Sequence, residues 1–420
     1  MPASPSTARA INDRLALDLL QREGPLTAGR LKQLTGLSRP TVADLVERLT
    51  VSGLIEVAGE SGEQRRGPNA KLYGIVAGRA HLAALDVRTE SVAVLVSDLL
   101  GRVLAEASVP IGDNTGTGPA VERAVGLVER AAKEAGAERL HTVGIGVPGL
   151  IDPAGGELRG SSGLPEWHRR LMAALQERYP EARVGVENET NLAALAEQRD
   201  GAARDRDTFV LLWLGLGIGA AVVLDGTLRR GVSGGAGEIG FLPVPGTSGL
   251  PSATDCDGGF HSVAGATAVA ALAARHGVTA VPEGPEPHAA ALVREAVRRS
   301  STDKDGEGCG DGEECGDHSQ NHHPDHAAAE RFLDALADRV ALGAAAVVSV
   351  LDPGCLVLAG EIGRAGAGTL ADRVQRRLTR MSPLATEVRP STLGGGAVLR
   401  GALLTARDRA QDVLFAPQGR

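Results

Sequence analysis

Polar side chains that could contact DNA bases gather near residue 40. Ser38, Arg39, Thr41 and Asp44 stand at the start of a predicted helix, where their side chains could face base edges in the major groove. Hydroxyl, guanidinium and carboxylate groups each match particular donor and acceptor patterns on those edges. The first chemistry that this chain indicates is therefore recognition of double-stranded DNA.

Basic side chains flank this helix. Arg65 and Arg66 lie in a polar turn and suit a narrow minor groove, where negative potential is concentrated. Lys32, Arg48 and Lys71 are expected to touch phosphates, which orient a protein on the duplex without reading its sequence. The predicted DNA-binding residues are Ser38, Arg39, Thr41, Asp44, Arg48, Arg65, Arg66 and Lys71.

Local signals predict the helices that carry these residues. A first helix is expected at Ile11–Arg22, because leucines recur there with helical spacing. A second helix ends at Gly36, and a third opens with Ser38 as its N-cap and Pro40 in its first turn. Two short helices joined by a tight turn form a helix-turn-helix, whose second helix enters the major groove.

A hairpin follows the helices. Residues 52–57 and 71–76 read as two strands around the polar turn. Three helices and a hairpin predict a winged helix-turn-helix domain over residues 1–76. The alternative is a helical dimerisation module with ordinary surface arginines.

Size and charge agree with a DNA-binding module fused to a larger body. A chain of 420 residues is expected to form two or three domains. Residues 1–76 hold ten Lys/Arg and eight Asp/Glu, a net charge of +2. Since the whole chain has a net charge of −8, the remaining residues carry −10. Four cysteines, no apolar signal core and no run of roughly 18–20 apolar residues favour a cytoplasmic protein without a membrane segment.

The body alternates β-rich runs with helical segments. One strand, turn, strand pattern surrounds residue 88, and a similar pattern with a glycine turn recurs from Phe209 to Gly226. This repetition predicts two related α/β lobes, at residues 77–200 and 201–420.

These lobes resemble the ROK family (repressor, open reading frame, kinase), in its regulator branch with a winged helix. The resemblance implies an α/β fold of two actin-like (ribonuclease H-like) lobes around a cleft. It is carried, in order, by residues 144–152, 164–167, 186–197, 234–240, 352–360 and 393–402.

Kinases of this family transfer phosphate from ATP to a sugar, and departures from the family pattern predict that this chain lacks that activity. The family's first phosphate loop reads Asp-x-Gly-Gly-Thr and aligns with Asp86 of this chain. Here Arg88 and Thr89 replace the two glycines, and Glu90 replaces the threonine. Side chains there block the close approach of main chain to phosphate, and Glu90 would repel it.

Two further positions depart from the kinase pattern. The second phosphate loop keeps Gly215, Gly217 and Gly219 but carries Leu216 in place of threonine. The presumed catalytic aspartate is Glu189, which moves the carboxylate by about one methylene. We therefore expect no catalytic residue and no cofactor.

The sugar site that the resemblance implies is partly kept. Asn188, Glu189 and Glu238 are the predicted effector-binding residues, whereas family contacts are replaced by Gly163, Phe241 and Val263. Three interpretations stay open: a sugar or sugar-derivative effector, a reshaped pocket for another small molecule, and a cleft that serves only as a dimer scaffold.

The structural zinc site of the family is not expected. Its histidine corresponds to Phe241, and its cysteine run is reduced to Cys256, with His261 nearby. One cysteine cannot complete the tetrahedral site that structural zinc needs, although Cys256, His261 and nearby aspartates could improvise a ligand set.

Residues 301–326 lack large apolar side chains and are predicted to form a disordered acidic insertion between two helices. Its two cysteines, Cys309 and Cys315, and its four histidines could bind a transition metal. The alternative is a solvated insertion with incidental affinity.

Taken together, the sequence predicts a transcription regulator of carbohydrate-related genes, acting as a repressor. Its expected partners are a palindromic operator and a small effector, and its expected state is a homodimer or homotetramer. The alternatives are an ATP-dependent sugar kinase with an appended DNA-binding head and a DNA-binding scaffold that responds to no ligand.

Overall fold

The computed structural model describes most of the chain and divides it into two compact units. The first comprises Met1–Ile145, Glu166–Gly185 and Ala402–Arg420, and the second comprises Gly146–Pro165 and Val186–Gly401. The sequence-based boundaries at residues 76 and 200 differ from this grouping and remain a prediction. The described residues are 5–60, 70–112, 114–159, 164–247, 249–254, 257–284, 286–301 and 323–416.

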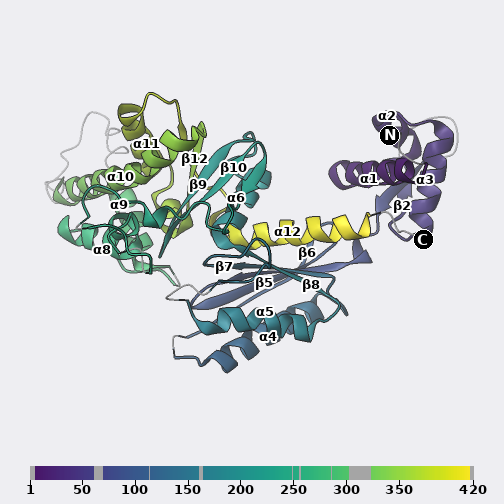
Figure 1. Ribbon diagram of the computed structural model, residues 1–420, viewed down its shortest axis with the longest axis horizontal. Coiled ribbons are helices and arrows are strands. Elements are labelled where there is room, and N and C mark those ends of the chain that lie inside the picture. Colours follow the sequence, from purple (N-terminus) through teal and green to yellow (C-terminus); the bar gives the residue numbers. More distant parts are fainter. Residues whose placement is uncertain are drawn as a thin grey trace, which may run out of the picture. The chain divides into compact units, whose positions relative to one another are not determined.

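The first unit begins with three helices and a small sheet (Figure 1). Helix α2 is capped by the Thr27 hydroxyl and ends at Gly36, whose φ of 71° is the left-handed conformation that glycine adopts readily. Helix α3 is capped by Ser38 and carries proline in its first turn, as the sequence predicts. The elements are α1 (Pro5–Glu23), β1 (Leu26–Thr27), α2 (Ala28–Thr35), α3 (Arg39–Val51), β2 (Ile55–Glu60) and β3 (Lys71–Ile75).

The predicted winged helix-turn-helix is confirmed, with three corrections. Helix α1 starts at Pro5 rather than Ile11, and β2 starts at Ile55 because residues 52–54 form the turn that ends α3. The short strand β1 was not predicted; two residues carry no periodicity, and only their pairing with β3 defines them. The sheet order is β1-β3-β2.

The remainder of the first unit builds a five-stranded sheet in the order β6-β5-β4-β7-β8. Strands β4, β5 and β6 form an antiparallel meander, and α4 packs against β5 and β6 (Figure 1). The bounds are η1 (Ala77–Arg79), β4 (His81–Val87), β5 (Ser91–Asp98), β6 (Val103–Pro110), α4 (Thr117–Glu134), β7 (Thr142–Val147), α5 (Glu166–Arg178) and β8 (Arg183–Asn188).

The second unit repeats this topology with the order β11-β10-β9-β12-β13. Its first three strands are again an antiparallel meander, and β12 lies parallel to both β9 and β13. If the strands of each sheet are numbered 1 to 5 along the chain, both sheets have the spatial order 3-2-1-4-5. This shared topology confirms two related α/β lobes. The elements are α6 (Glu189–Asp200), β9 (Phe209–Leu214), β10 (Ile218–Leu224), β11 (Thr227–Arg229), η2 (Ile239–Phe241), α7 (His261–Ala264), α8 (Ala266–Arg275), α9 (His288–Ser301), α10 (His323–Leu351), β12 (Cys355–Ala359), α11 (Gly360–Met381), β13 (Glu387–Pro390), η3 (Gly394–Gly396) and α12 (Ala397–Leu414).

Helices α9 and α10 flank the predicted acidic insertion. Helix α10 begins at His323, so residues 323–326 are helical rather than part of a disordered segment. Residues 302–322, with Cys309 and Cys315, lie outside the described residues.

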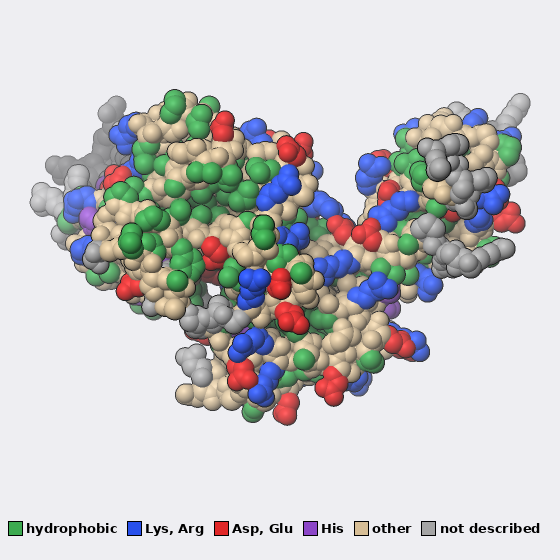
Figure 2. All heavy atoms as spheres, viewed as in Figure 1, with side chains coloured by type: hydrophobic (Ala, Val, Ile, Leu, Met, Phe, Trp, Pro, Cys, Tyr) green, Lys and Arg blue, Asp and Glu red, His purple; other side chains and the backbone are tan. Residues whose placement is uncertain are grey.

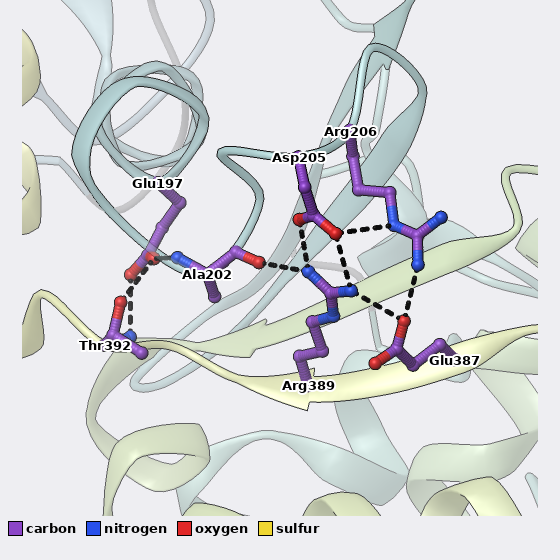
Figure 3. Close-up of polar contacts among 7 residues, drawn as sticks. All are labelled: Glu197, Ala202, Asp205, Arg206, Glu387, Arg389 and Thr392. Carbon is purple, nitrogen blue, oxygen red and sulfur yellow. Dashed lines mark hydrogen bonds and ion pairs between the residues drawn. The ribbon is translucent and has the colours of Figure 1, made fainter.

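A dense polar network ties the end of α6 to β13 and to the connection that follows it (Figure 3). Arg389 on β13 donates to Asp205, Glu387 and the Ala202 carbonyl oxygen, and its Nη1 lies 2.6 Å from the Asp205 carboxylate. Hydrogen bonds from this arginine lower the pKa of Asp205 to about 2. The network holds β13 against the segment that follows α6.

Candidate functional site

Helix α3 of the head has one buried and one exposed face. Val42, Leu45, Val46 and Leu49 are buried, whereas Arg39, Ala43, Asp44 and Glu47 are exposed. A helix whose apolar stripe faces the core must present its other residues outward. The predicted base-reading positions therefore lie on the accessible side.

The hydroxyl groups of Ser38 and Thr41 use part of their hydrogen-bonding capacity in the N-cap of α3. The Ser38 hydroxyl accepts a hydrogen bond from the Thr41 amide at 3.3 Å, and the two hydroxyl oxygens lie 2.8 Å apart. Of the predicted contacts in this turn, Arg39 and Asp44 are the ones with exposed charged groups.

Arg48 is held by two carboxylates. Its Nε and Nη2 donate to Asp13 on α1 at 3.4 and 2.6 Å, and its Nη1 donates to Asp44 one turn earlier on α3. The hydrogen bond to Asp13 raises the pKa of Arg48. This arrangement gives the arginine a structural role that the sequence did not reveal, because Asp13 is distant in the chain.

The other predicted contacts lie at the hairpin. Lys71 opens β3, is exposed and pairs across the sheet with Glu60. Arg65 and Arg66 lie outside the described residues. Figure 2 shows basic and acidic side chains interspersed over the face of the molecule in view.

In the second unit, Asn188 caps α6 and anchors a neighbouring loop. Its Oδ1 accepts hydrogen bonds from the Thr190 and Asn191 amides at 2.8 and 3.3 Å, and its Nδ2 donates to the Gly149 carbonyl oxygen at 2.9 Å. Most of the polar capacity of this amide is therefore used internally. Glu189 follows as the first residue of α6 and is half-buried.

An ion pair with a buried carboxylate lies beside Asn188. Glu187 is 5% exposed and accepts hydrogen bonds from Asn191 Nδ2 at 2.9 Å and from Arg230 Nε at 2.6 Å. Arg230 remains half-exposed, so its guanidinium is available at the surface of the same cluster. Sequence reasoning missed both residues, because Arg230 comes after β11 and no local signal links it to Glu187.

The glycine-rich segment that carries Glu238 packs main chain against main chain. A Cβ at Gly234, with φ of +81°, would overlap the Ile151 carbonyl oxygen, and one at Gly237, with φ of +94°, would overlap that of Ala220. The Gly237 carbonyl oxygen also accepts a hydrogen bond from the Ala220 amide at 2.8 Å. These contacts set the position of Glu238.

Asn188 and the segment that carries Glu238 therefore both contact one loop of the second unit. Asn188 binds the 149–151 loop at Gly149, and Gly234 packs on Ile151, four residues before Glu238. Burial raises the pKa of Glu238, although its side chain keeps contact with solvent. Carboxylate, amide and guanidinium groups of this kind can bind vicinal hydroxyls.

The first phosphate-loop position is a tight turn between β4 and β5. The Arg88 amide donates to the Ser91 carbonyl oxygen at 2.9 Å, and the Arg88 side chain binds Asp86 at 3.0 Å. His168 on α5 lies 3.3 Å from the Arg88 carbonyl oxygen, and burial lowers its pKa to about 4. Side chains and hydrogen bonds thus occupy a turn that glycines would leave open.

The second phosphate-loop position is approached by an acidic side chain. A Cβ at Gly215 would overlap the Glu361 carboxylate, which comes from the first turn of α11. Leu216 at the tip of the loop is 68% exposed. A carboxylate against this loop disfavours a phosphate there, and the sequence motif alone did not indicate it.

No group of three or more potential metal ligands occurs within the described ranges. His261 opens α7, and burial lowers its pKa. Cys256 lies outside the described residues. Among the helices that the structure describes, none is both long and apolar enough to cross a bilayer.

A winged helix-turn-helix head joined to two actin-like lobes defines the class of this protein. Residues 82–409 match the model of the ROK family, and residues 11–67 match that of the MarR family. Since the first match covers most of the chain, the protein belongs to the ROK family.

Known relatives include both regulators and enzymes. The xylose repressor of Caldicellulosiruptor bescii is 25% identical over 240 residues, which are 56% of this chain and 59% of that repressor. The glucokinase of Thermotoga maritima is 27% identical over 349 residues, 81% of this chain and 99% of the enzyme. A solved ROK family transcriptional regulator, a homologue of the E. coli MLC protein, has a TM-score of 0.71 at 20% identity and covers 97% of this chain and 98% of its own. The chain thus spans about three-fifths of the length of the curated repressors that it matches first.

Proposed function

We propose that this protein is a transcription regulator, acting as a repressor of carbohydrate-related genes. The observation that carries the proposal is the winged helix-turn-helix head, with Arg39 and Asp44 exposed on a well-capped second helix. A helix of this kind is suited to the major groove. Curated relatives named xylose repressor and N-acetylglucosamine repressor support the same function.

We further propose that a sugar or sugar derivative is the effector and binds around the 149–151 loop. Asn188, Glu189 and Glu238 would provide amide and carboxylate contacts, and Arg230 adds a donor that the sequence did not predict. The effector would favour a state with lower operator affinity. A coupling free energy of about 1–3 kcal/mol corresponds to a roughly 5- to 150-fold change in affinity.

We propose that the protein has no kinase activity. Two independent features support this: Arg88–Glu90 carry side chains where the kinase loop has two glycines and a threonine, with Arg88 bound to Asp86, and Glu361 lies against Gly215. Both act against binding of a triphosphate, one by steric hindrance and one by charge repulsion.

The proposal is tested by selecting bound DNA from a genomic library with the full chain, followed by binding assays with and without each member of a sugar panel. The expected result is an enriched palindrome whose complex is weakened by one sugar class. Binding by a homodimer or homotetramer would show as half-sites in phase. A protein that enriches no sequence would contradict the proposed regulator.

The second candidate function is an ATP-dependent sugar kinase with an added head. The nearly full-length match to a glucokinase favours it. Phosphorylation of the same sugar panel with magnesium and ATP separates the two functions. Activity that disappears in Glu189→Gln would overturn the proposal, whereas no turnover and no thermal shift with the nucleotide would support it.

A further inference from the structure

Asp44 on α3 accepts a hydrogen bond from an arginine of the same helix. Arg48 lies one helical turn further along and bridges it to Asp13 on α1, with a bidentate contact to Asp13. The side chains of Arg48 and Asp13 are 29% and 23% exposed, whereas that of Asp44 is 55% exposed. Asp44 is therefore the most exposed member of the cluster, and the guanidinium of Arg48 is less accessible to solvent.

The charge of this cluster argues against a phosphate contact by Arg48. One guanidinium faces two carboxylates, which gives the group a net charge of −1. Such a group repels the DNA backbone, and moving Arg48 to a phosphate would leave Asp13 and Asp44 without their cation. Arg48 is instead placed to hold Asp44.

The position of Asp44 suits contact with a base. It is exposed in the N-terminal half of α3, the part of a helix-turn-helix that reaches base edges. A carboxylate in the major groove can only accept hydrogen bonds, so it favours the amino group of cytosine and is repelled by the acceptor atoms of guanine and thymine.

Resting on the proposed operator-binding function, we propose that Asp44 reads the amino group of a cytosine in each half-site, and that Arg48 and Asp13 are positioning residues that fix its carboxylate. Binding specificity at that base pair then depends on a residue of α1 that does not enter the groove.

The test selects bound sequences from a randomised palindromic library with the full-length protein and its variants. Asp44→Ala should lose the cytosine preference at one base pair per half-site, with a roughly 5- to 150-fold drop for the preferred base, while its affinity for unrelated DNA rises. Asp44→Asn should shift the preference at that pair to adenine, because an amide can bind adenine in a bidentate manner.

The positioning residues are tested by their effect on that same base pair. Arg48→Lys and Asp13→Asn should broaden the preference there, leave the other positions unchanged, and leave the salt dependence of binding unchanged. Glu56→Ala, which removes one negative charge from β2, serves as the control for a general gain in affinity. Thermal unfolding verifies that each variant is folded.

Other outcomes would contradict either the inference about Asp44 and Arg48 or the proposed function. If Arg48→Ala weakens binding uniformly and lowers the salt slope by about one, Arg48 contacts a phosphate and the inference is wrong. An enriched operator that is insensitive to Asp44→Ala also overturns the inference alone. A wild-type protein that enriches no sequence overturns the proposed function, and the inference with it.

Discussion

Glu238 combines an accessible side chain with a carboxyl group whose pKa burial has raised. It therefore takes up a proton at a higher pH than an ordinary glutamate does. The ionised form accepts hydrogen bonds from hydroxyl groups, and protonation removes part of this capacity. A raised pKa also means that ionisation costs the folded state stability as pH rises through it.

We predict that Glu238→Ala abolishes the response to effector while operator affinity stays unchanged. In the wild type, effector affinity should fall as pH falls through the raised pKa, and Glu238→Gln should lack this pH dependence. Calorimetric titration of the effector over about pH 5 to 8 measures both effects. Because the desolvated charge is removed, the Gln variant should unfold at the same or a higher temperature than the wild type. Normal induction in the Ala variant would exclude this carboxylate from the effector site.

The segment from Gly234 to Gly240 shows how an element can position a residue through main-chain contacts alone. Gly237 has φ of +94° and lies against the Ala220 carbonyl oxygen, whereas Gly246 has a nearly identical φ of +92° and nothing within 4 Å of its added Cβ. The two glycines share the left-handed conformation but differ in whether an added Cβ would meet main chain, so a comparison of the two isolates much of that contact.

We predict that Gly237→Ala costs clearly more free energy of unfolding than Gly246→Ala. Both substitutions pay for a left-handed backbone, about 1–2 kcal/mol. Only the first must also displace β10, so it should disturb the effector site as well. Urea denaturation compares the two variants. Equal losses would mean that the contact with Ala220 contributes little.

A second element-scale feature is the clamp that Glu197 forms at the end of α6. Its buried carboxylate accepts hydrogen bonds from the amides of Ala202, Thr392 and Leu393 and from the hydroxyls of Ser391 and Thr392. Figure 3 shows its contacts with Ala202 and Thr392. The carboxylate thus joins α6 to the connection between β13 and α12.

We predict that Glu197→Ala lowers the free energy of unfolding by about 3 kcal/mol or more, because several buried donors lose their acceptor. Ser391→Ala removes one hydrogen bond of the same cluster and should cost about 1 kcal/mol. Chemical denaturation measures the loss in free energy of unfolding for each variant, and the two losses are then compared. A loss in Glu197→Ala as small as that in Ser391→Ala would show that the other donors find new partners.

Local signals in the sequence predicted local structure well. The caps at Ser38 and Gly36 and the repeated strand pattern could be read because they depend on neighbouring residues. Contacts between distant segments could not, since no periodicity records them: Asp13 holds Arg48, and Glu361 approaches Gly215. The candidate effector residues were named from resemblance, and their binding of a ligand stays a prediction.

At the scale of the whole molecule, α12 belongs to both units. Its first residues lie in the second unit, and from Ala402 onward it belongs to the first. A Cβ at Gly144 would overlap the Ala402 carbonyl oxygen, and Gln411 donates to Gln21 of α1 at 2.9 Å. Asp412 also forms an ion pair with Arg14 at 3.0 Å.

We predict that a chain ending at Gly401 loses the folded state of the first unit, including its operator binding. Removal of the part of α12 from Ala402 onward would expose the β7 surface that it covers and the partners of its polar residues on α1. A chain ending at residue 416 is the control and should behave as the full chain does. Soluble yield and operator binding measure the outcome; a stable, DNA-binding protein that ends at Gly401 would contradict it.

The position of α12 in the chain also constrains the order of events during synthesis. Residues 402–416 leave the ribosome after every other described segment, yet they complete the unit that contains the first helices. The DNA-binding head therefore acquires its full set of contacts only after residues 402–416 have been synthesised. Nascent chains that do not yet contain residues 402–416 would then be poor competitors for the operator.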